Sequence, residues 1–154
     1  MMEATHKDRR VLAQCKENNK LNELKGISVE LDRCQKSLTN YLENKRQNLS
    51  RFYFIPDDDL LQILGTSDPK AITPHLLKLY DNNKELTFGP GNKTVIAMTS
   101  DEGESYMFEN PVKPEGNIED WMNRLDVEMK KTLHVFCKKA VFFYAKMERV
   151  EWIM

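Results

Sequence analysis

Cysteine is scarce in this 154-residue chain, and its placement excludes two ways of stabilising a small fold. Cys15, Cys34 and Cys137 are odd in number and have no close pair. They therefore give neither the ligand spacing of a zinc site nor a disulfide framework. We expect reduced thiols, as in a cytosolic protein.

Long apolar runs are also missing. No stretch reaches the roughly 20 apolar residues that a membrane-spanning helix requires. The first ten residues are polar and charged, unlike a secretory signal peptide. These absences lead us to expect a soluble protein with no membrane partner.

The sequence lacks a complete catalytic or nucleotide-binding motif. The loop Gly89–Thr94 ends in Lys-Thr, but Asn92 stands where a phosphate-binding loop needs glycine, so a β-turn is expected. Asp57–Asp59 could bind a metal, although after Pro56 these acids fit the start of a helix better. None of the three histidines lies in a catalytic motif, so we expect neither an enzyme site nor a bound cofactor or metal. The histidines are His6, His75 and His134.

Charge is distributed unevenly although the net charge is only −1. Residues 1–51 carry eleven Lys and Arg against seven Asp and Glu, and residues 121–154 carry seven against four. Residues 52–120 carry five against thirteen. An acidic middle between basic ends favours specific protein contacts and argues against a nucleic-acid partner, which needs a continuous basic face.

The amino-terminal third predicts helices over about 9–49. Apolar residues spaced by three and four form one stripe, and Gly26 is expected to separate a first helix from the main one. The aromatic run Arg51–Ile55 predicts a buried extended segment. Short helices follow over about 57–80, with a kink or a restart expected after Thr73, because Pro74 lies inside the second of them. The stripe consists of Leu24, Ile27, Leu31, Cys34, Leu38 and Tyr41.

Residues 86–109 predict three short antiparallel strands, with Asp101–Gly103 as the turn of a hairpin. A long amphipathic helix is expected over about 117–150, with Asn117 as its N-cap. The fold class is thus mainly α with a small antiparallel β unit, in one elongated segment covering residues 1–154.

Three phrases carry a family resemblance: Leu38–Arg46 (LTNYLENKR), Arg51–Ile55 (RFYFI) and Asp59–Leu64 (DLLQIL). Their succession resembles the linker region of dynein heavy chains, where a "YLE-x-KR" helix end leads into "PRFFF" and then "LLEIL". Further matching phrases extend the resemblance over roughly residues 31–152. Ser50 departs from it, because the family has proline there, and residues 81–93 match loosely. Cys34–Leu38 looks closer to ciliary heavy chains than to cytoplasmic ones.

The resemblance implies a mechanical role. The dynein linker is an arm that bends and straightens over a ring of AAA+ ATPase modules, and this swing is the power stroke along microtubules. It implies that ATP and magnesium bind only in that ring, carboxy-terminal to this segment. The implied partners are the ring, adjoining linker segments, the dynein complex and microtubules, in a ciliary or flagellar axoneme. The alternative is a free-standing helical adaptor module unrelated to motors.

Two residue sets follow as predictions. The first comprises charged residues at element ends that are candidate contacts with the ring or a neighbouring segment, unless they only cap helices and pair locally. These are Lys45, Arg46, Arg51, Asp101, Glu102 and Gly103. The second is the expected structural core: Leu38, Tyr41, Leu42, Phe52, Phe54, Leu61, Leu64 and Trp121.

Overall fold

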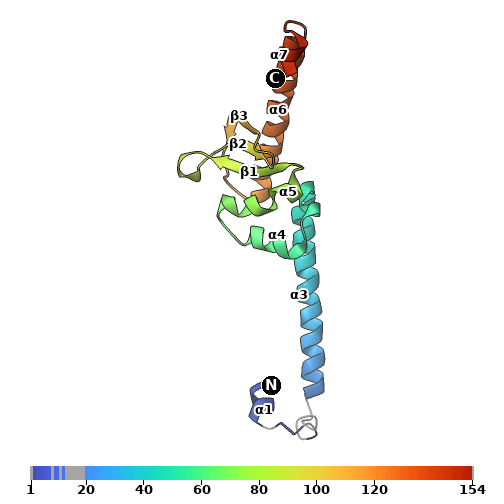
Figure 1. The fold of residues 1–154 in the computed structure, drawn as a ribbon. Helices are drawn as coiled ribbons and strands as arrows, with labels where there is room; N and C mark the ends of the chain where they lie inside the picture. Colours follow the sequence, from blue (N-terminus) through green and yellow to red (C-terminus); the bar gives the residue numbers. More distant parts are fainter. Residues whose placement is uncertain (1, 8, 11, 13–19, 154) are drawn as a thin grey trace. The chain divides into compact units, whose positions relative to one another are not determined.

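The computed structural model describes residues 2–7, 9, 10, 12 and 20–153, shown in Figure 1. Its contacts divide the chain into two units, Met1–Tyr41 and Leu42–Met154. The architecture is mainly helical with one three-stranded antiparallel sheet, which confirms the predicted fold class. No helix among the described residues combines the length and apolar character needed to cross a bilayer.

The first unit contains helix α1 (Met2–Lys7) and most of helix α3 (Lys20–Asn48), which continues into the second unit. The predicted break at Gly26 is wrong, because α3 runs through it. A single interior glycine costs a helix only about 1 kcal/mol relative to alanine, and its neighbours Leu24, Lys25 and Ile27 sustain the helix. The helix expected before Lys20 falls mostly outside the described residues.

The aromatic run forms 3-10 helix η1 (Ser50–Phe54), so the prediction of an extended segment is wrong. Leu49, Phe52 and Ile55 are all buried. Because a 3-10 helix has three residues per turn, this spacing places the three side chains on one side. Phe54 lies off that side and is 68% exposed, which corrects its assignment to the core.

Helix α4 (Asp57–Leu64) follows, with the three predicted acids in its first turn. Next come η2 (Pro69–His75) and α5 (Leu76–Leu79), so the restart near Pro74 is confirmed, at Leu76. The Asp68 carboxylate caps η2 by accepting a hydrogen bond from the Lys70 backbone N–H (3.0 Å).

The sheet has the order β1-β2-β3, formed by β1 (Asn83–Phe88), β2 (Val95–Ser100) and β3 (Ser105–Val112). The short helix η3 (Pro90–Asn92) joins β1 to β2. Met98 pairs with Leu86 on one side and with Tyr106 on the other. The hairpin turn lies at Asp101–Gly103 as predicted, and Gly103 has a positive φ of 91°.

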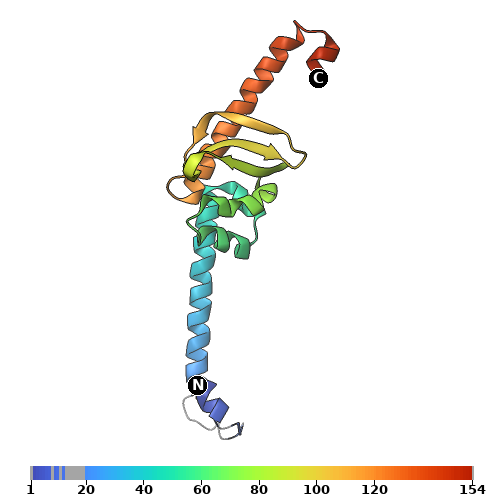
Figure 2. The same ribbon diagram turned by 60° about the vertical axis from the view of Figure 1, so that its left-hand side comes forward.

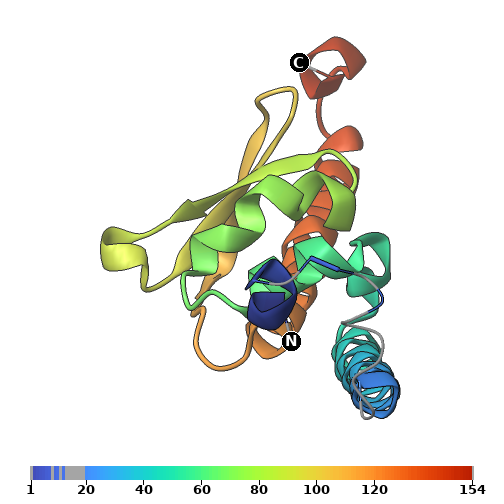
Figure 3. The same cartoon turned by 90° about the horizontal axis from the view of Figure 1, so that it is seen from below.

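Helix α6 (Ile118–Tyr144) packs against β3, and Figure 2 shows the strands lying across it. η2 and α5 lie along β1, as Figure 3 shows from below. Buried side chains from these elements form one core in the second unit, and Leu61 and Leu64 pack against it partly buried. The core includes Leu42, Phe52, Leu60, Ile72, Leu76, Met98, Trp121, Met122 and Leu125.

The last helix ends earlier than predicted. α6 stops at Tyr144, and a separate short helix α7 (Arg149–Ile153) follows. Trp152 donates its indole N–H to the Ala140 carbonyl (2.8 Å). Its ring also packs edge-on against the ring of Tyr144, with 5.1 Å between the two ring centroids. These contacts hold α7 back against α6, so a helix continuous to residue 150 is not formed.

Candidate functional site

Lys45 lies in the last turn of α3 and pairs with Glu119 in the first turn of α6. The ammonium donates a hydrogen bond to Glu119 Oε1. The Glu119 side chain is only 3% exposed and that of Lys45 18%. A carboxylate this deeply buried requires a cation beside it, since an unpaired buried charge is strongly destabilising. The pair therefore fixes the end of α3 to the start of α6.

Arg46, the next residue, serves a different set of partners. Its guanidinium donates to the carbonyls of Phe52 (3.4 Å) and Ile55 (3.0 Å) and to the Asp57 carboxylate (2.6 Å). It thereby satisfies carbonyls at the end of η1 and neutralises an acid at the start of α4. This geometry fixes the chain direction between α3 and α4.

Arg51 in η1 joins three elements. Its guanidinium binds Asp126 of α6 (Nη2–Oδ1 2.7 Å, Nε–Oδ1 2.9 Å) and donates to the Leu79 carbonyl in α5 (2.9 Å). It also lies 4.2 Å from the ring centroid of Tyr80, a cation–π distance. We refer to Arg51, Asp126, Leu79 and Tyr80 as the arginine clamp.

The electrostatics of the clamp favour its charged form. Burial alone would raise the pKa of Asp126, but hydrogen bonds from Lys130 and Arg51 outweigh that effect and hold the pKa below its ordinary value. Burial raises the pKa of Tyr80, so this phenol stays neutral. The Tyr80 hydroxyl has no hydrogen-bond partner among the described residues.

A second polar contact fastens the sheet to α6. The buried Glu128 carboxylate accepts hydrogen bonds from the backbone N–H (2.9 Å) and the side-chain amide (3.0 Å) of Asn110. One turn further, the Thr132 hydroxyl accepts a hydrogen bond from the Glu109 N–H (3.3 Å). These bonds occupy donors in the stretch of β3 between Met107 and Val112, where the pairing register with β2 is interrupted.

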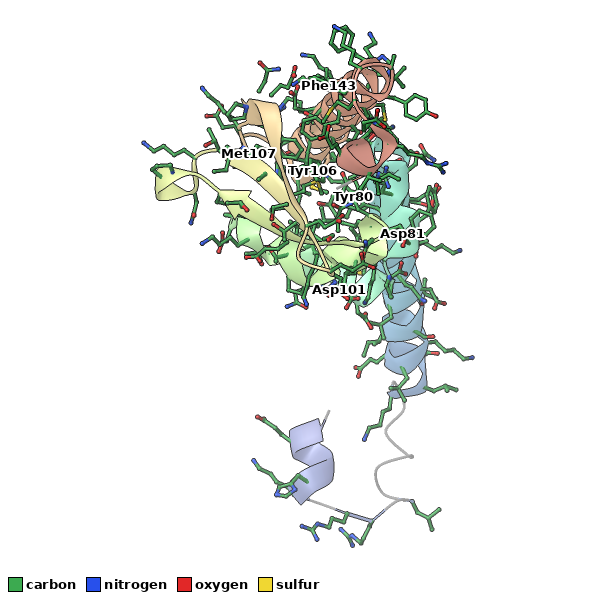
Figure 4. The ribbon with its side chains drawn as sticks, turned by 45° about the horizontal axis from the view of Figure 1, so that its top comes forward. Tyr80, Asp81, Asp101, Tyr106, Met107 and Phe143 are labelled. Atoms are coloured by element: carbon green, nitrogen blue, oxygen red, sulfur yellow. The ribbon has the colours of Figure 1, made fainter. Side chains whose placement is uncertain are left out.

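The acidic turn is the exposed part of the predicted set. Asp101 pairs with Lys84 (2.8 Å), and its backbone N–H donates to the Asn82 carbonyl (3.1 Å). Figure 4 shows Asp81 and Asp101 at the same end of the sheet. Glu102 is exposed, and Gly103 donates its N–H to the Ser100 carbonyl (3.2 Å). The side chains of this turn are therefore accessible.

The structure therefore separates the six candidate interface residues into two kinds. The cations Lys45, Arg46 and Arg51 form ion pairs within the second unit, which is the local pairing considered above as the alternative to an interface role. The three residues of the turn, 101–103, are exposed. Among the expected core residues, Leu42, Phe52 and Trp121 are buried, whereas Leu38 and Tyr41 are exposed on α3. Their assignment to the core is wrong, because each is more than 40% exposed in the first unit, whereas the buried part of α3 begins with Leu42, the first residue of the second unit.

The carboxylates that receive these cations were not predicted as partners. Asp126 falls four residues after Met122 and three before Met129, on the apolar stripe of α6. A carboxylate on a buried stripe requires a cation opposite it, so the position of Asp126 could have predicted a cationic partner from another element. Its identity as Arg51 could not be read from sequence, because 75 residues separate the two.

The loops that resembled ligand sites have simpler structures. Gly89–Thr94 is a tight turn closed by the Gly89 N–H donating to the Thr94 carbonyl (2.8 Å), and strand β2 follows. Asp59 of the acidic cluster binds Lys78 (2.7 Å), which lowers the pKa of that carboxyl. Within the described part of the chain, no three His, Cys, Asp or Glu side chains are grouped to hold a metal.

Comparison with known proteins identifies the family. Residues 1–140 match the family described as dynein heavy chain, N-terminal region 2. The chain is 49% identical over 153 residues to the dynein-1-alpha heavy chain of the flagellar inner arm I1 complex of Chlamydomonas reinhardtii. It is 42% identical over 158 residues to human dynein axonemal heavy chain 10, and 46% identical over 136 residues to human cytoplasmic dynein 2 heavy chain 1.

These alignments cover 99%, 100% and 88% of the chain, but only 3%, 4% and 3% of the respective relatives. The match therefore concerns a short region of much longer proteins. With a family match over residues 1–140, the chain belongs to the dynein heavy chain family and corresponds to part of its N-terminal region.

Proposed function

We propose that this chain is a segment of the dynein linker, the arm whose bending and straightening over the AAA+ ring produces the power stroke. The observation that carries the proposal is the match to dynein heavy chain N-terminal region 2. It leaves the alternative of a helical adaptor unrelated to motors without support. In this proposal ATP and magnesium bind elsewhere in the heavy chain, and this segment transmits force.

The packing of the second unit suits force transmission. A lever must resist bending within each of its rigid parts, so that motion is concentrated at a few interfaces. The Lys45–Glu119 pair and the arginine clamp cross-link the end of α3, η1, α5 and the first half of α6. We propose that these contacts make residues 42–132 one stiff body.

The partners follow from the same proposal. They are the ring and adjoining linker segments of the same heavy chain, within a dynein complex on microtubules. The axonemal relatives support a ciliary or flagellar setting. Of the predicted contact residues, Asp101, Glu102 and Gly103 are the exposed ones, so we assign this turn to contact with the ring or a neighbouring segment.

The experiment uses a complete heavy chain carrying Arg51→Ala, with purified motors assayed for ATP hydrolysis and microtubule gliding. A softened lever should reduce gliding velocity while ATP turnover per motor is retained. The matched control is Lys93→Ala, which removes an exposed cation from the loop before β2. Unchanged gliding with the clamp removed, or equal losses in both variants, would contradict the proposal.

The proposed contact of the acidic turn needs its own variant. Asp101→Lys together with Glu102→Lys reverses its charge without removing a buried group. Glu115→Lys is the control, since this exposed acid lies in the loop before α6. We expect altered coupling of ATP hydrolysis to gliding only for the turn variant, and normal coupling would remove the turn from the interface.

A further inference from the structure

Strand β3 forms one edge of the sheet, because among the described strands it pairs with β2 only. The Ser100 backbone N–H donates to the Glu104 carbonyl (2.8 Å), and Met98 is paired with Tyr106. Hydrogen-bonded positions alternate along an antiparallel strand, so the backbone groups of Tyr106 face β2 and those of its two neighbours face away from it. We name these two neighbours the open edge: Ser105 and Met107.

The open edge is accessible to another chain. Both of its residues are exposed, and Met107 is 67% exposed. Within the described residues, neither backbone forms a hydrogen bond outside the sheet. Further along β3 the N–H groups of Glu109 and Asn110 are already bound by Thr132 and Glu128 of α6. The groups left for an added strand are therefore the N–H and C=O of the two open-edge residues.

The segment that carries the open edge is acidic. From Ser100 to Pro111 the sequence has four acids and neither lysine nor arginine. Asp101 is paired with Lys84 (2.8 Å), but the other three are exposed and form no ion pair within the described part of the chain. These three are Glu102, Glu104 and Glu109. Their charge repels the same edge of a second copy and leaves the edge to a partner of opposite charge.

An unpaired strand edge binds an extended peptide, whose backbone supplies the missing hydrogen bonds. Lysine or arginine at both ends of the peptide would face Glu104 and Glu109, and an apolar side chain between them would pack on Met107. At about 3.3 Å per residue, the two cations would be about 16 Å apart. Because the open edge offers few backbone groups, the interface is small and reversible.

The source of the peptide follows from the charge and the size of this interface. Electrostatic attraction mainly raises the rate at which separate molecules meet, whereas a segment of the same chain is already held nearby. A small contact with unbalanced charge therefore favours a separate polypeptide. We propose that β3 is a docking edge for a basic extended segment of another subunit, which joins the sheet as an added strand along Ser105 and Met107.

A synthetic peptide tests the edge in a purified, complete heavy chain. Its sequence is Lys-Thr-X-Thr-Thr-Lys, where X is p-benzoylphenylalanine and lies opposite Met107 when the peptide pairs antiparallel to β3. After irradiation, mass spectrometry should map the product to residues 105–109. N-methylation of the fifth residue removes an N–H that faces Ser105 and should lower the yield about fivefold. N-methylation of the fourth residue is the control, because that N–H faces away from β3.

Variants of the heavy chain separate strand addition from attraction by charge alone. Met107→Pro removes one outward N–H at a position where an edge strand tolerates proline, whereas Met107→Leu keeps that N–H. The yield should fall about fivefold in the proline variant only. Glu104→Lys combined with Glu109→Lys should abolish the product, and the exposed Glu115→Lys should not. Products elsewhere on the chain, or equal yields in the two Met107 variants, would overturn the proposal.

The natural partner is identified by placing p-benzoylphenylalanine in place of Met107 in a heavy chain within its assembled dynein complex. The expected product joins β3 to a segment of another subunit that has lysine or arginine on both sides of the cross-linked residue. Products within the heavy chain, with a second heavy chain or with lipid would each contradict the proposal. The proposal requires the family membership and the sheet edge only, so it can fail while the mechanical role stands.

Discussion

The guanidinium of Arg51 and the carboxylate of Asp126 meet at 2.7 Å although 75 residues separate them in sequence. Their contact is the part of the arginine clamp that joins η1 to α6. It also explains why an aspartate can occupy the apolar stripe of α6. The stability of the second unit should therefore depend on this pair.

Removing either partner should destabilise the protein. We expect Arg51→Ala and Asp126→Ala each to lower the free energy of unfolding by about 2 kcal/mol, because the remaining charge loses its partner in a partly buried position. Urea unfolding of both single variants and the double variant measures the coupling energy. Lys130→Ala breaks only the exposed helical pair with Asp126 and should cost about 0.5 kcal/mol or less. Additive single-variant effects would show that the pair contributes no coupling.

The contribution of Asp126 should depend on pH with a defined sign. Its pKa is lower in the folded protein than its ordinary value, so the unfolded chain takes up the proton first as pH falls. The stabilisation is therefore complete above about pH 4, the ordinary range of this carboxyl, and is lost as pH falls through the folded pKa. The measurement is the difference in unfolding free energy between wild type and Asp126→Asn at neutral and acidic pH. We expect this difference to shrink in acid, and growth of the difference would contradict the assignment.

Phe52 and Phe54 provide a matched pair within one 3-10 helix. Phe52 is fully buried, so Phe52→Ala should cost about 3–5 kcal/mol through lost burial and a cavity. Phe54 is largely exposed, and Phe54→Ala should change stability by about 0.5 kcal/mol or less. Thermal or urea unfolding distinguishes the two. Similar losses of unfolding free energy in the two variants would instead support the buried extended segment expected from sequence.

Two glycines should respond to alanine in opposite directions. Gly103 has a φ of 91° in the hairpin turn, where a side chain is strained, so Gly103→Ala should cost about 1–2 kcal/mol. Gly26 lies in α3 with no atom within 4 Å of an added Cβ, so Gly26→Ala should favour the helix by about 0.5–1 kcal/mol. Unfolding measurements test the first and circular dichroism at 222 nm the second. A loss of helicity in Gly26→Ala would mean that α3 does not run through this position.

Local chemistry was sufficient for several elements. The stripe of α6 and the helix start after Asn117 follow from side-chain spacing and first-turn acids alone. The turn at Asp101–Gly103 follows from a glycine that tolerates positive φ between two strand-like runs. Each depends on residues within a few positions of one another.

Other features were decided only by tertiary structure. Spacing could not tell an extended run from a 3-10 helix at Ser50–Phe54, because the outcome depends on the core that receives Leu49, Phe52 and Ile55. The end of α6 at Tyr144 depends on the return of Trp152 to the Ala140 carbonyl.

The sequence alone determined the fold class, the hairpin, the apolar stripes and the resemblance to dynein heavy chains, since short-range spacing and chain order encode all four. Tertiary structure decided which cation meets which carboxylate, which aromatic ring is buried, and where each stripe passes from the core into solvent. Those outcomes depend on contacts between residues such as Lys45 and Glu119, 74 positions apart. Their energies exist only once packing has excluded water from between them.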